Sequence, residues 1–163
     1  MPFIKRCFLA IDRPEDRPHT LLWLFTQFLG SIIVIIVIAI ISEVYFSISW
    51  PNIGLFVICL AMIGDGFAEP IGVRFGKHRY RTFALFTKKR YYRTIEGSLA
   101  VFISTIFVVL VFGYLFTDEQ LFYALIILPI AITLTEAFSP HTWDSPFLLG
   151  VAGFGTVAIL SNF

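Results

Sequence analysis

Charged residues are scarce in this 163-residue chain: Asp, Glu, Lys and Arg make up 14% of it, whereas soluble domains carry about 25%. Hydrophobic residues make up 58%, and the mean hydropathy of +0.85 leaves too little polar surface to cover a soluble core. This composition excludes a disordered or fibrous protein and indicates an integral membrane protein. The net charge of +1 provides no basic excess that would favour nucleic-acid binding.

Several sequence signatures of soluble enzymes are also missing. The two cysteines, Cys7 and Cys59, provide neither a disulfide framework nor a CxxC metal site, and the three histidines have no HExxH spacing. There is no GxSxG nucleophile turn, and the stretch from Gly72 to Lys77 has only three residues between its glycines, so it is not a GxxxxGK phosphate loop. We therefore expect neither a zinc hydrolase nor a soluble type of nucleotide-binding loop.

Five apolar runs predict an all-α, polytopic membrane bundle of about five transmembrane helices, in a single domain covering residues 1–163. The first run has 21 residues, enough to cross about 30 Å of hydrocarbon at about 1.5 Å per residue. No small-residue cleavage site follows it, so we expect it to remain in the mature protein. The last two runs are short and are expected to tilt or to end beside prolines. The runs are Leu21–Ile41, Asn52–Val73, Gly97–Phe116, Leu121–Thr135 and Phe147–Leu160.

Basic residues are concentrated in two places. All twelve Lys and Arg lie within Lys5–Arg17 and Arg74–Arg93. Because cytoplasmic loops collect Lys and Arg, we expect the N-terminal segment 1–20 and the basic loop 74–94 to face the cytoplasm. With five spans, the C-terminus would then lie on the opposite side of the membrane.

Five of the eleven acidic residues fall at the expected cytoplasmic ends of spans or in cytoplasmic loops: Asp65, Glu69, Glu96, Glu136 and Asp144. Asp65 and Glu69 are four residues apart and would share one helix face near the membrane, where ionised carboxylates are costly. Both could pair with basic residues of the adjoining loop. For Asp65, which stands between two glycines, we favour a role in holding a divalent cation whose remaining ligands are phosphate oxygens.

A phosphate site is predicted next to these acids. Gly97 and Ser98, at the expected start of a helix, would present free amides that bind phosphate. The combination of carboxylates, basic loop and helix start favours a nucleoside triphosphate as ligand. Attraction to anionic lipid headgroups is the alternative explanation for the loop, above all for Arg79 and Arg81. The basic residues that border the glycine-bearing segments are Lys77, Lys88, Lys89 and Arg93.

Three blocks, in this order, resemble the polyprenol kinase family: GDGFAEPIGVRFGKHRYRT (64–82), RTIEGSLAVF (93–102) and TEAFSPHTWDSP (135–146). That family includes phytol kinase, dolichol kinase and the CTP-dependent diacylglycerol kinases, and it is related to the phosphatidate cytidylyltransferases. The resemblance covers essentially the whole chain, although family members usually carry further N-terminal spans. Arg93 stands where the family usually has Lys, Ser145 follows Asp144 where the family has Asn, and the basic loop is longer.

The resemblance implies a site that binds CTP and Mg²⁺. In this chain, Asp65 and Asp144 would serve the metal and the triphosphate, and Asp65, Glu136 and Asp144 would form the catalytic set. Either Asp144 or Glu136 would orient the hydroxyl of the substrate. The residues implied in nucleotide and phosphate binding are Gly64, Gly66, Gly72, Gly76, Lys77, Lys88, Lys89, Arg93, Glu96, Gly97 and Ser98.

These features predict a membrane-embedded lipid-alcohol kinase that transfers the γ-phosphate of CTP, or of another nucleoside triphosphate, to an isoprenoid alcohol such as phytol, farnesol or dolichol. The first alternative is a phosphatidate cytidylyltransferase, whose C-terminal signature is absent here. The second is a non-catalytic membrane subunit or a transporter, but an ion path would need acids at several depths rather than at one face. Because five short spans make a thin wall around a lipid site, we expect a homodimer.

Overall fold

The computed structural model describes residues 19–82, 91–140 and 143–162, without the side chains at positions 64 and 65. These residues form helices α2 (Thr20–Phe46), α3 (Trp50–Phe75), α4 (Ile95–Val111), α5 (Asp118–Phe138) and α6 (Asp144–Asn162), the short 3-10 helix η2 (Gly113–Leu115) and strands β1 (Arg79–Thr82) and β2 (Tyr91–Thr94). The expected all-α helical membrane bundle is confirmed, with the two short strands as an addition.

The helix ends depart from the apolar runs for local reasons. Helix α5 begins at Asp118 because Thr117 caps it: the Thr117 hydroxyl accepts from the Gln120 amide at 3.3 Å, and the Gln120 side chain accepts from the Thr117 amide at 2.9 Å. It ends at Phe138 because Ser139 precedes a proline and takes an extended backbone. Helix α4 stops short of its predicted end, and the chain continues as η2.

Four helices, α2, α3, α5 and α6, are long and apolar enough to cross a membrane. Helix α4 has 17 residues, which span about 26 Å at about 1.5 Å per residue, slightly less than a typical hydrocarbon core of about 30 Å. Helix α2 has 27 residues and a length of about 40 Å, so it must tilt or extend beyond the core. The bundle thus has the dimensions of a multi-pass membrane protein.

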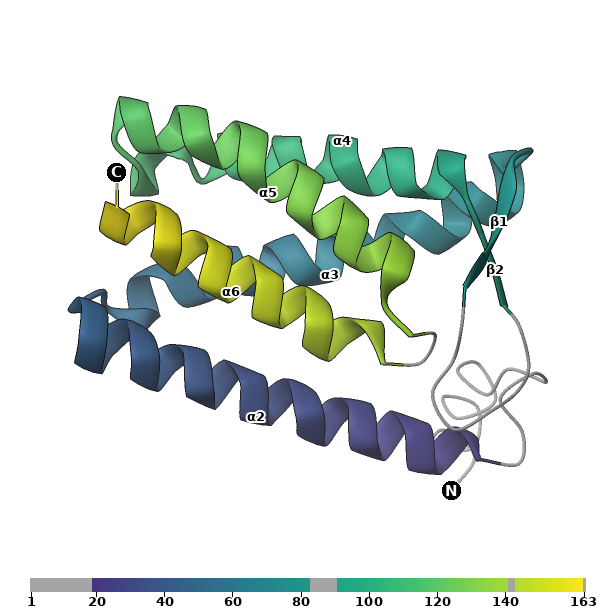
Figure 1. The fold of residues 1–163 in the computed structure, drawn as a ribbon, viewed down its shortest axis with the longest axis horizontal. Helices are drawn as coiled ribbons and strands as arrows, with labels where there is room; N and C mark the ends of the chain where they lie inside the picture. Colours follow the sequence, from purple (N-terminus) through teal and green to yellow (C-terminus); the bar gives the residue numbers. More distant parts are fainter. Residues whose placement is uncertain (1–18, 83–90, 141–142, 163) are drawn as a thin grey trace, which may run out of the picture.

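The helices run alternately up and down, so their connections fall at two ends of the bundle (Figure 1). One end, called the ribbon end below, holds the start of α2, strands β1 and β2, and the connection from α5 to α6. The other end holds the α2–α3 connection, η2 and the end of α6. The start of the first span and the end of the last one therefore lie at opposite ends.

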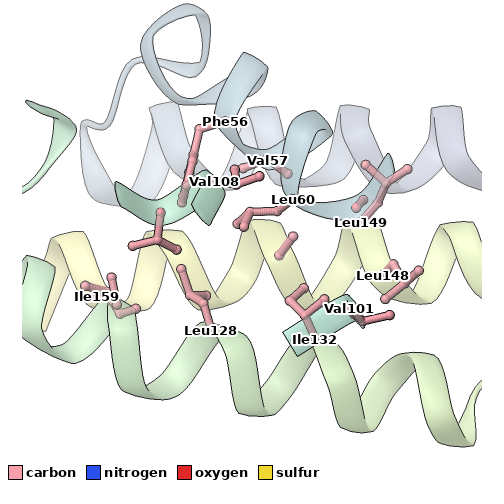
Figure 2. Close-up of a cluster of buried hydrophobic side chains, with 14 of the residues drawn as sticks. Phe56, Val57, Leu60, Val101, Val108, Leu128, Ile132, Leu148, Leu149 and Ile159 are labelled. Carbon is pink, nitrogen blue, oxygen red and sulfur yellow. The ribbon is translucent and has the colours of Figure 1, made fainter. Parts of the chain in front are cut away.

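The apolar core is built by α3, α4, α5 and α6, whereas α2 lies along the outside of α6. Helix α2 approaches α6 closely at Gly153, where an added methyl group would overlap the side chain of Ile38. Small residues at such positions permit the close packing that holds helices together in lipid. The fully buried core residues shown in Figure 2 include Phe56, Val57, Leu60, Val101, Leu128, Ile132, Leu148 and Ile159.

The described parts of the predicted basic loop form a two-stranded antiparallel ribbon, which the sequence analysis did not predict. Tyr80 pairs with Arg93, and Arg81 pairs with Tyr92. Because alternate strand residues face opposite sides, Tyr80 and Arg93 are partly buried against the bundle, while Arg81 and Tyr92 are exposed. The ribbon thereby places Arg93 against the ribbon end of the helix bundle.

Candidate functional site

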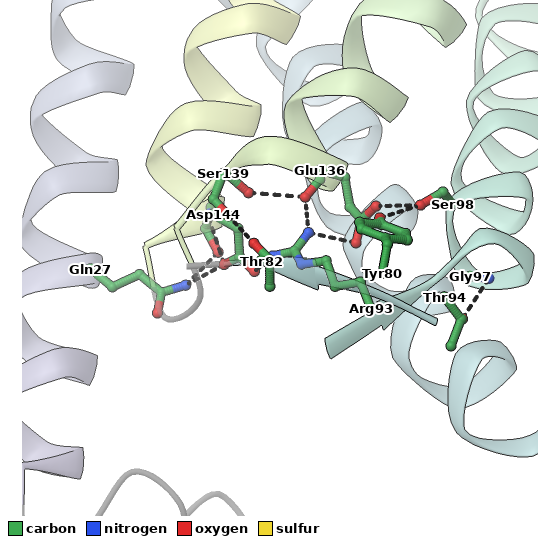
Figure 3. Close-up of polar contacts among 11 residues, drawn as sticks. Gln27, Tyr80, Thr82, Arg93, Thr94, Gly97, Ser98, Glu136, Ser139 and Asp144 are labelled. Atoms are coloured by element: carbon green, nitrogen blue, oxygen red, sulfur yellow. Dashed lines mark hydrogen bonds and ion pairs between the residues drawn. The ribbon is translucent and has the colours of Figure 1, made fainter. Parts of the chain in front are cut away.

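The Arg93 guanidinium lies at the centre of a polar group at the ribbon end (Figure 3). This group, called the Arg93 group below, consists of Arg93, Ser98, Glu136 and Asp144. Its NH1 lies 2.5 Å from Oε1 of Glu136 and also donates to the Glu136 carbonyl oxygen, and its NH2 lies 3.1 Å from Oδ2 of Asp144. The side chains of Arg93, Glu136 and Asp144 are 11%, 5% and 15% exposed, respectively. Hydrogen bonds between charged groups are strong, so one cation joins strand β2 to helices α5 and α6.

A second set of hydrogen bonds holds Glu136 from the side of α4. The Ser98 hydroxyl donates to Oε2 of Glu136 at 3.1 Å, and the Tyr80 hydroxyl lies 2.7 Å from Ser98 Oγ. Burial raises the pKa of the Tyr80 phenol above its ordinary value of 10.0. Because the single hydroxyl proton of Ser98 goes to Glu136, the Tyr80 hydroxyl donates to Ser98. Both carboxylate oxygens of Glu136 are engaged in this arrangement.

Asp144 is also contacted from the first span. Its Oδ1 accepts from the Ser145 amide at 3.0 Å and lies 3.4 Å from Nε2 of Gln27, which donates to the Ser145 hydroxyl at 2.6 Å. Gln27 and Tyr80 were not predicted as site residues. For Gln27 a signal was present, an amide within an otherwise apolar span. For Tyr80 there was none, because its position depends on the unpredicted strand.

The amino end of α4 differs from the predicted phosphate site. The amide of Ile95 donates to the His78 carbonyl oxygen at 3.0 Å, and the amide of Gly97 donates to the Thr94 hydroxyl at 3.1 Å. The prediction of a free amide at Gly97 is therefore wrong, because the chain caps this helix itself, whereas for the amide of Ser98 it stays a prediction. Ser98 enters the site through its hydroxyl.

Three of the predicted phosphate-binding glycines pack closely around Thr94. An added Cβ at Gly72 would lie 2.7 Å from the Thr94 hydroxyl oxygen, and one at Gly76 would overlap the Thr94 methyl group. At Gly97, an added Cβ would lie 2.8 Å from the carbonyl oxygen of Ala68 on α3. These contacts explain the three glycines by packing, and a role of theirs in phosphate binding stays a prediction.

Gly97→Ala and Gly66→Ala are expected to affect stability in opposite directions. A methyl group at position 97 would press on the α3 backbone, which we expect to lower the free energy of unfolding by about 1–3 kcal/mol. At Gly66 an added Cβ meets no described atom within 4 Å, and alanine favours a helix by about 1 kcal/mol over glycine. Titration with SDS in mild detergent, followed by circular dichroism, measures both variants. A Gly97→Ala protein as stable as wild type would contradict this packing.

Glu96, predicted to bind nucleotide, holds the turn that precedes β1. Its carboxylate lies 2.8 Å from Nδ1 of His78 and accepts from the His78 amide at 3.3 Å. Neither contact belongs to the Arg93 group, so Glu96 fixes the ribbon to the start of α4. A direct role of Glu96 in nucleotide binding stays a prediction.

The structure brings together only part of the predicted site. Lys77 is described and exposed. Lys88 and Lys89 lie outside the described residues, and the positions of Gly64 and Asp65 are described only as backbone of α3. Roles for these residues stay predictions. The predicted site residues that meet in one group are Arg93, Ser98, Glu136 and Asp144.

Among the described side chains, no group of three or more His, Cys, Asp or Glu residues is placed to hold a metal ion. Mg²⁺ that accompanies a nucleotide needs only one or two carboxylates, because phosphate oxygens and water complete its shell. Both oxygens of Asp144 have described partners, so a role of Asp144 in holding the ion stays a prediction. The group of Arg93, Glu136 and Asp144 also carries one positive and two negative charges, which favours an additional cation.

A cleft of about 660 Å³ lies at the opposite end of the bundle. Its walls combine apolar side chains, among them Ile53, Phe112 and Leu160, with the polar residues Ser49 and Asn52. No member of the Arg93 group lines it, so we place the candidate chemistry at the ribbon end.

Comparisons with protein-family models, with curated proteins and with solved structures found no match. The fold defines the class of the protein, a polytopic helical membrane protein with a buried ionic group at one end. Its function has to be argued from the geometry of that group.

Proposed function

We propose that the protein is a membrane-embedded lipid-alcohol kinase that transfers the γ-phosphate of CTP, or of another nucleoside triphosphate, to an isoprenoid alcohol such as phytol, farnesol or dolichol. The observation that carries this proposal is the Arg93 guanidinium held between the carboxylates of Glu136 and Asp144 at one end of a membrane bundle. A guanidinium binds phosphate oxygens, and a carboxylate accepts the proton of a hydroxyl group. Phosphoryl transfer to an alcohol uses a cationic group on the phosphates and an acceptor for the hydroxyl proton.

Arg93 retains donors for a phosphate. A guanidinium has five N–H groups, and those used here point to the Glu136 carbonyl oxygen, to the Glu136 carboxylate and to Asp144. The Nε–H group and one N–H of NH2 have no acceptor among the described residues. Because the two carboxylates already fix the guanidinium, it would meet a phosphate with little further ordering.

Of the two carboxylates, Asp144 is better suited to accept the proton. The Glu136 side chain is 5% exposed and is the less accessible of the two. Asp144 is 15% exposed. We assign to Asp144 the acceptance of the hydroxyl proton while the alcohol oxygen bonds to the γ-phosphorus and the nucleoside diphosphate departs. Glu136 holds Arg93 in position.

Magnesium would enter with the nucleotide and neutralise charge on the phosphates. Asp65 is the carboxylate proposed to hold the ion. The described Lys and Arg residues all lie at the ribbon end, in β1, β2, the adjoining end of α3 and the connection between α3 and β1. Because basic residues collect on the cytoplasmic side, we propose that this end faces the cytoplasm, where nucleoside triphosphates are present.

The experiment is a phosphate-transfer assay with purified protein in detergent. It uses γ-labelled CTP or ATP, Mg²⁺, and a panel of phytol, farnesol, dolichol, diacylglycerol and phosphatidate, with Asp65→Asn as the control variant. Labelled isoprenoid phosphate that forms with wild type and is lost in the variant is the expected result. Pyrophosphate release with phosphatidate alone would instead identify a cytidylyltransferase. No turnover with any lipid would contradict an enzyme and favour a non-catalytic subunit.

A further inference from the structure

The first span reaches the Arg93 group through one turn of helix α2. Trp143 Nε1 donates to the Thr26 hydroxyl at 3.2 Å, and the Gln27 amide donates to the Ser145 hydroxyl at 2.6 Å. One turn further on, an added Cβ at Gly30 would lie 3.3 Å from both Trp143 and Pro146. Helix α2 is therefore seated directly on the segment that carries Asp144.

Packing alone does not explain a glutamine at this position. The residues of α2 that are buried are Thr20, Trp23, Ile38 and Ser42, so Gln27 is not part of a large buried interface. A polar side chain in an apolar span is costly and usually has a specific partner. Here the partners are the side chains of Ser145 and Asp144, 118 and 117 residues away in the sequence.

Gln27 and the Ser145 amide together set the orientation of the Asp144 carboxylate. The Ser145 amide and Gln27 Nε2 both lie on the side of Oδ1, at 3.0 and 3.4 Å. Rotation of the carboxylate would break both contacts. With Oδ1 held there, Oδ2 is directed to Arg93 at 3.1 Å.

We infer that Gln27 is a positioning residue of the site, whose amide holds Oδ1 of Asp144 so that Oδ2 faces Arg93 and the incoming hydroxyl. This inference rests on the proposed function, because it assigns Gln27 a role in orienting the proton acceptor. It also makes the first span a part of the site and not only a membrane anchor. Thr26 provides a matched comparison, since it joins the same helix turn to Trp143 without contacting Asp144.

The kinetic test compares wild type, Gln27→Leu and Thr26→Val in the phosphate-transfer assay. We expect Gln27→Leu to lower kcat by about tenfold or more, because small misplacements of reacting groups are costly, and to leave KM for the nucleotide within about twofold. Thr26→Val is expected to retain kcat within about threefold, although it also loses a contact between α2 and the site segment. In the double variant Gln27→Leu/Ser145→Asn, the asparagine supplies an amide next to Asp144 from helix α6 instead of helix α2. We expect this double variant to recover part of the lost kcat.

Cross-linking tests the contact without any activity. In a background that carries Cys7→Ala and Cys59→Ala, the pair Gln27→Cys and Ser145→Cys is treated with a short bismethanethiosulfonate reagent. We expect an intramolecular link, seen as faster gel migration that reverses on reduction. Gln27→Cys with Ser161→Cys, at the opposite end of the bundle, is expected to give none.

The outcomes separate the two proposals. Failure of the Gln27–Ser145 pair to link overturns the inference whatever the activity. A link together with an active wild type and an unimpaired Gln27→Leu variant also overturns it, and leaves the kinase proposal standing. A link with a wild type that is inactive on every lipid overturns the kinase proposal and the positioning role with it. A link, a kcat loss confined to Gln27→Leu, and rescue by Ser145→Asn support both.

Discussion

Arg93→Met is expected to lower the free energy of unfolding by about 3–5 kcal/mol, because it leaves two carboxylates without their shared cation in a poorly hydrated site. The Glu136 and Asp144 side chains are 5% and 15% exposed, so water cannot fully replace the guanidinium. Methionine keeps most of the length and apolar character of the arginine stem, which limits the change to the loss of charge and hydrogen bonds. Titration with SDS, followed by circular dichroism, measures the change.

Arg81→Met is the matched control for this experiment. Arg81 belongs to the same ribbon but is exposed on its outer face, where substitutions usually change stability by about 0.5 kcal/mol or less. Arg93→Lys keeps the charge but loses the planar fork that reaches two carboxylates, so its stability should fall between those of wild type and Arg93→Met. Equal stability of Arg93→Met and Arg81→Met would show that the ionic group does not hold this end of the bundle together.

The membrane bundle was largely predictable from the sequence. A helix that crosses a bilayer bonds its own backbone and needs about 20 mostly apolar residues, and each predicted run overlaps one of the helices. The helix ends were less predictable because they depend on particular local contacts. The Thr117 capping box extends α5 at its start, and the proline after Ser139 ends it.

The candidate site was predictable only in part. Basic and acidic residues could be assigned to the same end of the bundle, but Arg93 and Glu136 are 43 residues apart in the sequence. Their contact depends on the pairing of β1 with β2, and strands of four residues leave little periodicity to detect. The glycine pattern was misleading at Gly97 because ligand binding and close helix packing both require a missing side chain.

Asp144→Asn and Glu136→Gln are expected to impair the proposed reaction in different ways. Asparagine at position 144 can still accept a hydrogen bond from Arg93 but cannot take up the hydroxyl proton. We expect its kcat to fall by about 100-fold or more, the usual contribution of a general base, with KM for the nucleotide nearly unchanged. Steady-state kinetics with labelled nucleotide and the alcohol substrate measures both quantities.

Glutamine at position 136 has a different consequence, because Glu136 joins Arg93 on one side to Ser98 on the other. The loss of charge at position 136 should weaken the ion pair that holds the Arg93 guanidinium in place. We therefore expect Glu136→Gln to raise the KM for the nucleotide and to decrease the free energy of unfolding more than Asp144→Asn does. The opposite pattern would reverse the assignment of roles. In that case Glu136→Gln would have normal KM and stability but no turnover, while Asp144→Asn would remain active. The distinction follows from burial, because the Glu136 side chain is 5% exposed and the Asp144 side chain 15%, so a substrate hydroxyl reaches Asp144 more readily.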